Sequence, residues 1–318
     1  MTVTAIPDLS SHRFAISGSS GFLGQHLIRV LKRHRAQIIL LLRPDGPPID
    51  DPTIEQRQID FTCEESCAAS LSDVQPTQLI HLAGYANTDR SLASVTHALQ
   101  INLGATINLI MGAMDKVPEC RVVLAGSLEH ASPWREPLKL GSPYGMSKAM
   151  VEVLSGSLNL LYDANVLNMR IGMAYGEYDP KTRRIVPSVI LSLLAGESPA
   201  ISSTTRLCDW IHAEDVAEAL ILGSLLPRAE PSSIDVGWGL LASIGDMIDI
   251  VRDIIGTDIK PTVSSEMARQ HEQGRCADIV ATQAALGGWF PRIDLRQGLT
   301  RTIDWYRQQQ AGRNGDRP

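Results

Sequence analysis

The side chains best suited to proton transfer in this sequence are those of Tyr144 and Lys148, which stand four positions apart. On a helix this spacing places the phenol and the ammonium on one face. A phenol is a poor acid or base at neutral pH because its reference pKa is about 10, and a fixed cation nearby favours the phenolate. We therefore predict that Tyr144 carries the proton in a reaction and that Lys148 tunes its pKa.

Two further polar residues precede this pair. Ser127 follows the apolar run 121–125, where its hydroxyl could orient a substrate oxygen while Tyr144 moves the proton. Asn102, in the segment 101–104, could complete a Ser–Tyr–Lys–Asn set.

A carboxylate also lies close to this serine in the chain. Glu129 stands two positions after Ser127 and is predicted to be an auxiliary acid or base, or to hold a substrate hydroxyl. The alternative is a loop carboxylate that faces water. Leu128 cannot transfer a proton, whereas His130 could.

A glycine-rich segment, residues 18–24, follows the apolar run 14–17 and opens a helical pattern. Glycines in this place allow a tight turn, a close approach of backbone amides to a pyrophosphate, and close packing of helix on strand. The helix N-terminus then directs its positive dipole end at the phosphates. The sequence therefore predicts a dinucleotide site. The residues expected to line it here are Gly18, Ser20, Gly21, Phe22, Leu23 and Gly24.

The apolar run 38–42 ends in Arg43, where an NAD-selective site usually carries an acid that holds the ribose hydroxyls. An arginine in this place can pair with a 2′-phosphate, so NADP is favoured, while Asp45 keeps NAD as an alternative. Asp60, after the next run, is placed to meet the adenine. The lysine of the catalytic pair is expected to hydrogen-bond the nicotinamide ribose.

The elements that must position these groups are short apolar runs alternating with helical patterns. The runs 14–17, 38–42, 78–82 and 121–125 are continuous, as parallel strands covered on both faces should be. Leucines and a valine between the first two form a helical stripe. Further strands are expected at 166–171 and 234–236. The repeated βαβ pattern predicts an α/β fold with a doubly wound parallel sheet.

From about residue 176 prolines divide the chain into shorter pieces, and the strands lose their regular spacing. We expect a Rossmann domain over 1–175, to which 213–238 returns. A smaller C-terminal substrate lobe is expected from 176–212 and 239–318.

Composition excludes several classes of protein. The 318 residues are 44% hydrophobic and 20% charged, with a net charge of −6 and no basic stripe, so nucleic acid is not an expected partner. No signal-peptide pattern or membrane-length apolar stretch is present, which indicates a cytoplasmic protein without a membrane partner. Five scattered cysteines predict reduced thiols and no metal site.

Taken together, the motifs resemble the extended short-chain dehydrogenases/reductases of the NAD-dependent epimerase/dehydratase family, which act mostly on nucleotide sugars. The glycine segment, residues 81–84 and 101–104, the serine and the Tyr/Lys pair fall in family order. Segments 170–176, 209–215 and 286–299 resemble later family motifs, so the likeness extends nearly end to end.

This resemblance implies NADP, or NAD, as cofactor, a nucleotide-sugar substrate and a homodimer formed through helices of the first lobe. Beside the glycine segment and the Tyr/Lys pair, the expected cofactor-binding residues are Arg43, Asp60, Phe61, Leu82, Ala83, Gly84, Ile171 and Met173. The expected substrate-binding residues are Tyr85, Glu129, Arg206 and Arg269.

The departures from the family pattern are informative. Ile171 replaces a proline near the nicotinamide, and Cys208 replaces an arginine that commonly grips the substrate pyrophosphate. Arg206, two positions earlier, would share a strand face with Cys208 and could substitute for that arginine. Both Arg206 and Arg269 could equally be exposed surface arginines.

Three functions compete. A ketoreductase using NADPH on a keto-sugar nucleotide is favoured by Arg43 and is placed slightly ahead. A redox-neutral dehydratase or epimerase that retains its cofactor is favoured by Glu129. A non-catalytic NADP-binding sensor is the remote alternative, because such proteins tend to lose the Tyr/Lys pair.

Overall fold

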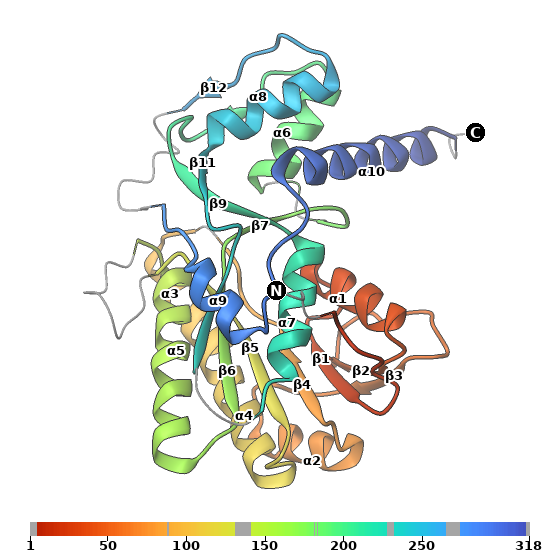
Figure 1. The fold of residues 1–318 in the computed structure, drawn as a ribbon, viewed down its shortest axis with the longest axis vertical. Helices are drawn as coiled ribbons and strands as arrows, with labels where there is room; N and C mark the ends of the chain where they lie inside the picture. The colour runs from red at the N-terminus through yellow and green to blue at the C-terminus, as the bar shows by residue number, and fades with distance from the viewer. Residues whose placement is uncertain are drawn as a thin grey trace.

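The computed structural model describes residues 5–87, 89–130, 141–180, 182, 184–227, 232–264 and 274–315. A seven-stranded parallel sheet forms the larger part of the molecule, in the order β10-β6-β5-β4-β1-β2-β3 (Figure 1). Its strands are β1 (Arg13–Ser17), β2 (Gln37–Leu42), β3 (Glu55–Gln58), β4 (Gln78–His81), β5 (Arg121–Ser127), β6 (Val166–Ile171) and β10 (Ser233–Val236). The predicted doubly wound fold is confirmed.

The strands other than β3 are rich in buried apolar side chains because both faces of the sheet pack against helices. In β2, Ile38 and Leu40 belong to one buried cluster, and Ile39 and Leu41 to the other. The first cluster includes side chains of two helices, α1 (Phe22–Arg33) and α7 (Ala213–Ser224). The second includes side chains of α2 (Glu64–Val74), α4 (Ala105–Lys116) and α5 (Pro143–Tyr162).

Between β4 and α4 the chain forms α3 (Leu92–Ala98) and a π-helical turn, η1 (Leu99–Gly104). Such turns are rare and occur frequently at functional sites. Here the turn directly precedes α4, and it contacts α5.

The smaller lobe lies above the carboxyl ends of the large sheet in Figure 1. It contains a three-stranded sheet of β11 (Leu241–Ser243), β9 (Leu207–His212) and β7 (Met173–Tyr175), and a parallel pair of β8 (Ala200–Ile201) and β12 (Thr262–Val263). Three helices, α6 (Ile185–Leu194), α8 (Ile244–Ile255) and α10 (Leu295–Gly315), contribute side chains to its own buried cluster.

Two details differ from the sequence-based expectations. The run before Asp60 was given no bounds in the sequence, because the residues of β3, Glu-Gln-Arg-Gln, are polar and the strand lies at the sheet edge, where one side needs no apolar cover. The expected assignment of all of 239–318 to the smaller lobe does not describe α9 (Ile279–Ala285). This helix contacts β10, and Leu286 and Trp289 after it join the first cluster of the large sheet.

In the described ranges, none of the helices is both long and apolar enough to cross a bilayer.

Candidate active site

The candidate site lies where the strand order of the large sheet reverses. The chain leaves β1 and β4, which are neighbours, toward helices on opposite faces of the sheet. In open α/β sheets this switch point at the carboxyl ends of the strands is where ligands bind. The glycine segment follows β1, residues 82–84 follow β4, and β5 ends at Ser127, beside Ile171 of β6.

The glycine segment is shaped by two positions that admit no side chain. Gly18 has φ +75°, and a Cβ there would lie 2.6 Å from the backbone nitrogen of Ala83. A Cβ on Gly24 would lie 2.4 Å from the carbonyl oxygen of Gly18. The glycine turn therefore packs directly on the loop that contains Leu82 and Ala83, and α1 packs directly on the turn.

The N-terminus of α1 is open to a ligand. Gly21 is its N-cap, and no side chain caps its first N–H groups. Ser20 is exposed, whereas Ser19 is buried with a hydroxyl that has no hydrogen-bond partner. Uncapped amides, a backbone cradle and an orphaned hydroxyl fit the pyrophosphate of a dinucleotide.

The residues expected at the adenosine end of the cofactor site differ in their exposure and contacts. The Arg43 side chain is 67% exposed, and its Nε lies 3.8 Å from Asp45. The Asp60 carboxylate accepts hydrogen bonds from the backbone and hydroxyl of Thr62, at 2.9 and 2.6 Å. The Phe61 side chain is buried in the second core cluster, so it packs on the protein.

The expected Ser–Tyr–Lys arrangement is formed at the other end of the site. Tyr144 lies in the first turn of α5, which begins because Ser142 caps it and Pro143 occupies its first position. Its phenol is close enough to the Ser127 side chain for the serine to lower the pKa of Tyr144. Lys148 lies one turn further, buried, with its Nζ 5.8 Å from the Tyr144 ring centre and donating to the Ala125 carbonyl at 2.7 Å.

The electrostatics of this trio differ from the simple expectation. Burial, and then the charge of Glu129, raise the pKa of Tyr144 to about 12; Arg184 and the hydrogen bond with Ser127 oppose this rise. Burial lowers the pKa of Lys148 to about 8. The charge of Arg184 lowers the pKa of Tyr144, and the lysine ammonium donates its hydrogen bond to the Ala125 carbonyl.

Glu129 lies at the same helix N-terminus. Its carboxylate accepts a hydrogen bond from the Ser142 hydroxyl, and its backbone N–H donates to Ser127 Oγ at 3.1 Å. It is half-buried, so the alternative of a loop carboxylate directed only at water is wrong.

His130, considered above as a second proton carrier, lies away from this group. It is 1% exposed, with Nε2 3.7 Å from Glu152. Glu152 also faces Arg170 of β6, within a buried cluster behind the site. Leu128 is buried as well. The two neighbours of Leu128 in the chain, Ser127 and Glu129, therefore lie at the site, whereas His130 does not.

Asn102 holds the site together from η1. Its side chain accepts from the Tyr85 N–H at 2.6 Å and donates to the Tyr85 carbonyl and to Ser147 Oγ, at 3.1 and 2.8 Å. Ser147 donates in turn to the Tyr144 carbonyl at 2.8 Å. Asn102 is 2% exposed, so it fixes the loop after Gly84 against α5. A Cβ on Gly84 would lie 3.7 Å from Lys148 Nζ.

Of the two expected substrate arginines, Arg206 lies in the part of the chain that the structure describes. Arg206 precedes β9, where its carbonyl accepts from Ile244, and Cys208 is buried in the core of the smaller lobe. Arg269 lies outside the described residues. Met173 opens β7, and Ile171 packs in the first core cluster.

Sequence reasoning missed Arg184, the N-cap residue of α6. Its guanidinium lies 5.7 Å from the Phe22 ring centre and 3.3 Å from Asp179, and its charge acts on Tyr144. No local motif marks it, because the contact spans the two lobes.

Comparisons with known proteins agree with this geometry. The sequence model described as the NAD dependent epimerase/dehydratase family matches residues 14–237. A dTDP-glucose 4,6-dehydratase of Streptomyces antibioticus is 28% identical over 323 aligned residues, covering 93% of this chain and 92% of that protein. A putative UDP-glucose 4-epimerase of Methanocaldococcus jannaschii is 27% identical, covering 91% and 97%.

Solved structures show the same fold. The UDP-glucose 4-epimerase of Thermotoga maritima with UDP-glucose superposes with a TM-score of 0.84 at 18% identity, covering 94% of this chain and 99% of that one. MoeE5 in complex with UDP-glucose and NAD superposes with a TM-score of 0.82 at 23% identity, covering 94% and 99%.

Proposed function

The chain belongs to the NAD dependent epimerase/dehydratase family, and from this premise we propose that it is a redox-neutral nucleotide-sugar epimerase that binds NAD. The relatives named above are an epimerase and a dehydratase, and one structural neighbour was solved with UDP-glucose and NAD. The proposed substrate is a nucleoside-diphosphate hexose such as UDP-glucose or dTDP-glucose.

The residues that would hold NAD are those of the glycine turn, the open N-terminus of α1 and the loop 82–84. When bound, NAD would supply an acceptor that takes a hydride from a sugar carbon and can return it. Lys148 lies beside the floor of this site near Gly84, where its ammonium can hydrogen-bond the nicotinamide ribose.

The reacting hydroxyl of the sugar is handled by the Tyr144 and Ser127 pair. Ser127 donates a hydrogen bond that orients the hydroxyl oxygen. Tyr144, as phenolate, accepts the hydroxyl proton while the carbon loses its hydride, and it gives the proton back on the reverse transfer. Because burial and Glu129 raise the pKa of Tyr144, the charges around it decide how much phenolate is present.

The observation that carries this proposal is the placement of Ser127, at the end of β5, close to Tyr144, with Lys148 one turn further along α5. With NAD as the hydride acceptor, this set would be sufficient to oxidise a carbinol carbon and reduce it again. Elimination of water would require a further acid beside it. The side chain at the adjacent position, Leu128, is apolar and buried, which favours epimerisation over dehydration.

A dehydratase is the second candidate, and Glu129 is the observation that favours it. The carboxylate lies close enough to Tyr144 for its charge to raise the pKa of the phenol. From this place it could abstract a proton from a neighbouring sugar carbon.

For the cofactor, NAD is proposed over NADP. The argument for NADP rests on Arg43, whose side chain is exposed and reaches the nearby Asp45. Such a surface arginine does not require a 2′-phosphate.

The test is the stoichiometry of the cofactor. We expect purified protein to carry NAD and to convert UDP-glucose or dTDP-glucose into an epimer with no net cofactor consumption. Product analysis by chromatography, with parallel absorbance of reduced nicotinamide, separates the possibilities. A keto-deoxy sugar would indicate the dehydratase, and consumption of NADPH in proportion to product would indicate the ketoreductase expected first from the sequence.

A homodimer is part of the proposal. The outer side of α5 exposes Met150, Val153, Leu160 and Leu161, at 41%, 37%, 84% and 67%. Met111 of α4 is exposed as well, at 38%. Burial of these apolar side chains against a second copy of the chain would be favourable in free energy.

A further inference from the structure

Helix α1 contacts the beginning of the smaller lobe along one of its faces. His26, Arg29 and Arg33 are spaced i, i+3 and i+7, so they lie on one side of the helix. His26 contacts Glu177 and Arg29 contacts Tyr178, the two residues that follow Gly176 after the β7 strand. Arg33 pairs with Glu214 of α7. The same helix presents its N-terminus to the proposed pyrophosphate.

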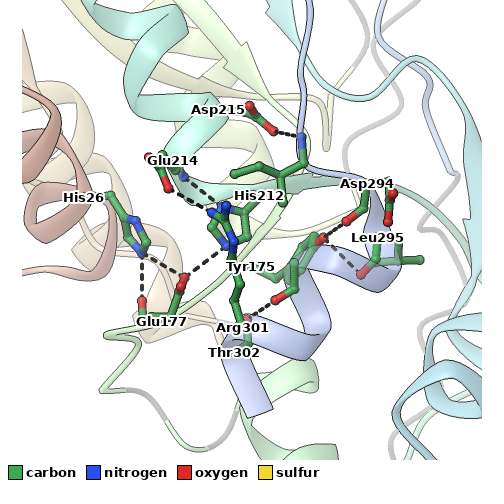
Figure 2. Close-up of polar contacts among 12 residues, drawn as sticks. His26, Tyr175, Glu177, His212, Glu214, Asp215, Asp294, Leu295, Arg301 and Thr302 are labelled. Carbon is green, nitrogen blue, oxygen red and sulfur yellow. Dashed lines mark hydrogen bonds and ion pairs between the residues drawn. The ribbon is translucent and has the colours of Figure 1, made fainter. Parts of the chain in front are cut away.

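Glu177 is held by two imidazoles from opposite sides, as Figure 2 shows. His26 Nε2 donates to the Glu177 carbonyl at 2.9 Å, and His212 Nε2 donates to its carboxylate at 3.0 Å. His212 Nδ1 accepts from the Glu214 N–H at 3.2 Å, so its proton is on Nε2. Burial lowers the pKa of His26 to about 4, which keeps this ring neutral at pH 7.

The backbone at this point is strained. Tyr178 has φ +65°, a left-handed conformation that is unfavourable for a non-glycine residue and persists only where the surroundings impose it. The surroundings here are the Arg29 guanidinium, 3.6 Å from the Tyr178 ring centre, and Trp305 of α10, whose ring centre is 5.3 Å away. The α1 face therefore contributes directly to the shape of this turn.

The segment held in this way leads to the candidate site. It continues to Asp179, whose carbonyl accepts from Tyr306 at 3.0 Å and whose carboxylate pairs with Arg184. The Arg184 guanidinium lies over the ring of Phe22, the first residue of α1 after the glycine turn. The Phe22 ring in turn packs edge-on against His26. The segment thus touches α1 at both the cofactor end and the next turn.

We propose that His26 is a positioning residue: through Glu177 it couples the cofactor-binding end of α1 to the segment that carries Arg184 into the site. This coupling rests on the proposed binding of NAD. Through it, bound cofactor orders the segment from Glu177 to Arg184, where the chain enters the smaller lobe. Because coupling between sites is reciprocal, a ligand held by that lobe also tightens the cofactor. The physical basis is the series of contacts from His26 to Glu177, from Asp179 to Arg184 and from Arg184 back to Phe22.

Hydrogen–deuterium exchange of the full chain, with and without NAD, tests this. Two regions report: peptides covering 18–30, and peptides covering 173–194, where the Ser188 N–H donates to the Arg184 carbonyl at 2.9 Å. In the wild type we expect NAD to slow exchange in both regions by about fivefold or more, the lower end of typical coupling.

The variants separate coupling from folding. His26→Leu removes the donor, and we expect NAD to protect 18–30 as before while its effect on 173–194 falls below about twofold. His26→Gln retains an N–H at nearly the same reach and should restore most of the coupling. His34→Leu makes the same change at the other end of α1 and should behave as the wild type.

The outcomes are distinguishable. If NAD protects neither region of the wild type, the proposed cofactor is wrong, and the coupling fails with it. If NAD protects 18–30 alone in the wild type, or protects 173–194 equally in His26→Leu, the cofactor proposal stands and the role of His26 is overturned.

Discussion

Replacement of Glu129 by glutamine is the perturbation that most sharply separates the possible roles of this carboxylate. The amide keeps an acceptor oxygen for the Ser142 hydroxyl but removes the negative charge beside Tyr144. That charge is the largest influence after burial among those that raise the pKa of Tyr144 to about 12. The pKa of Tyr144 should therefore fall in Glu129→Gln.

The size of the shift follows from the exposure of the carboxylate. A charge close to a titrating group changes its pKa by about 1–3 units, and Glu129 is half-buried, so we take about one unit. One pKa unit corresponds to about 1.4 kcal/mol, or a tenfold larger phenolate fraction of Tyr144 at any pH well below its pKa.

The assay is the pH dependence of kcat/KM, which reports groups of the free enzyme. The limb that rises as Tyr144 loses its proton should move to lower pH by about one unit in Glu129→Gln. Glu197→Gln, at an exposed position, is the control and should leave the limb in place. A limb that stays put or moves to higher pH in Glu129→Gln would refute the electrostatic reasoning. Complete loss of product, with reduced nicotinamide accumulating, would instead show that Glu129 transfers a proton at carbon, and would favour the dehydratase.

Four further predictions follow from the geometry. Tyr144→Phe should lower turnover by at least about 10²-fold in a steady-state assay while NAD titration shows nearly unchanged binding, and retention of most activity would contradict its role. Arg43→Asp should leave NAD affinity nearly unchanged by calorimetry and weaken NADP by about 1.5–3 kcal/mol; a wild type that binds NADP more tightly than NAD would reverse the cofactor assignment. Met150→Glu should shift the protein from dimer to monomer in light scattering at unchanged helicity, and a monomeric wild type would exclude the dimer. Finally, burial lowers the pKa of His26 from 6.5 to about 4, so the unfolded chain binds the proton first as pH falls, and up to about 3 kcal/mol of folding stability should be lost between pH 6.5 and 4. The lowered pKa of Glu177 should add a further loss at still lower pH. Urea unfolding at several pH values checks this, and the stability of His26→Gln should depend less on pH than that of the wild type.

The sequence by itself determined the features that depend on local chain chemistry. Continuous apolar runs specified buried parallel strands, because a strand covered on both faces needs apolar side chains in both directions. The glycine turn was recognisable because three glycines stand between an apolar run and a helical pattern. The structure adds that Gly18 has a left-handed φ, which other residues rarely adopt. Tyr144 and Lys148 were placed correctly on one helix face because four positions on a helix are a fixed geometry.

The tertiary structure decided everything that depends on which distant segments meet. Arg184 acts on Tyr144 although 40 positions separate them, and His26 contacts a residue 151 positions away. The direction of His130, adjacent to Glu129 in sequence, was likewise set by packing, because the chain after β5 turns one side chain toward the site and the next into a buried cluster. The pKa of Tyr144 also depends on tertiary structure. The spacing of Tyr144 and Lys148 is local, but burial and the charges of Glu129 and Arg184 act on the phenol only in the folded chain.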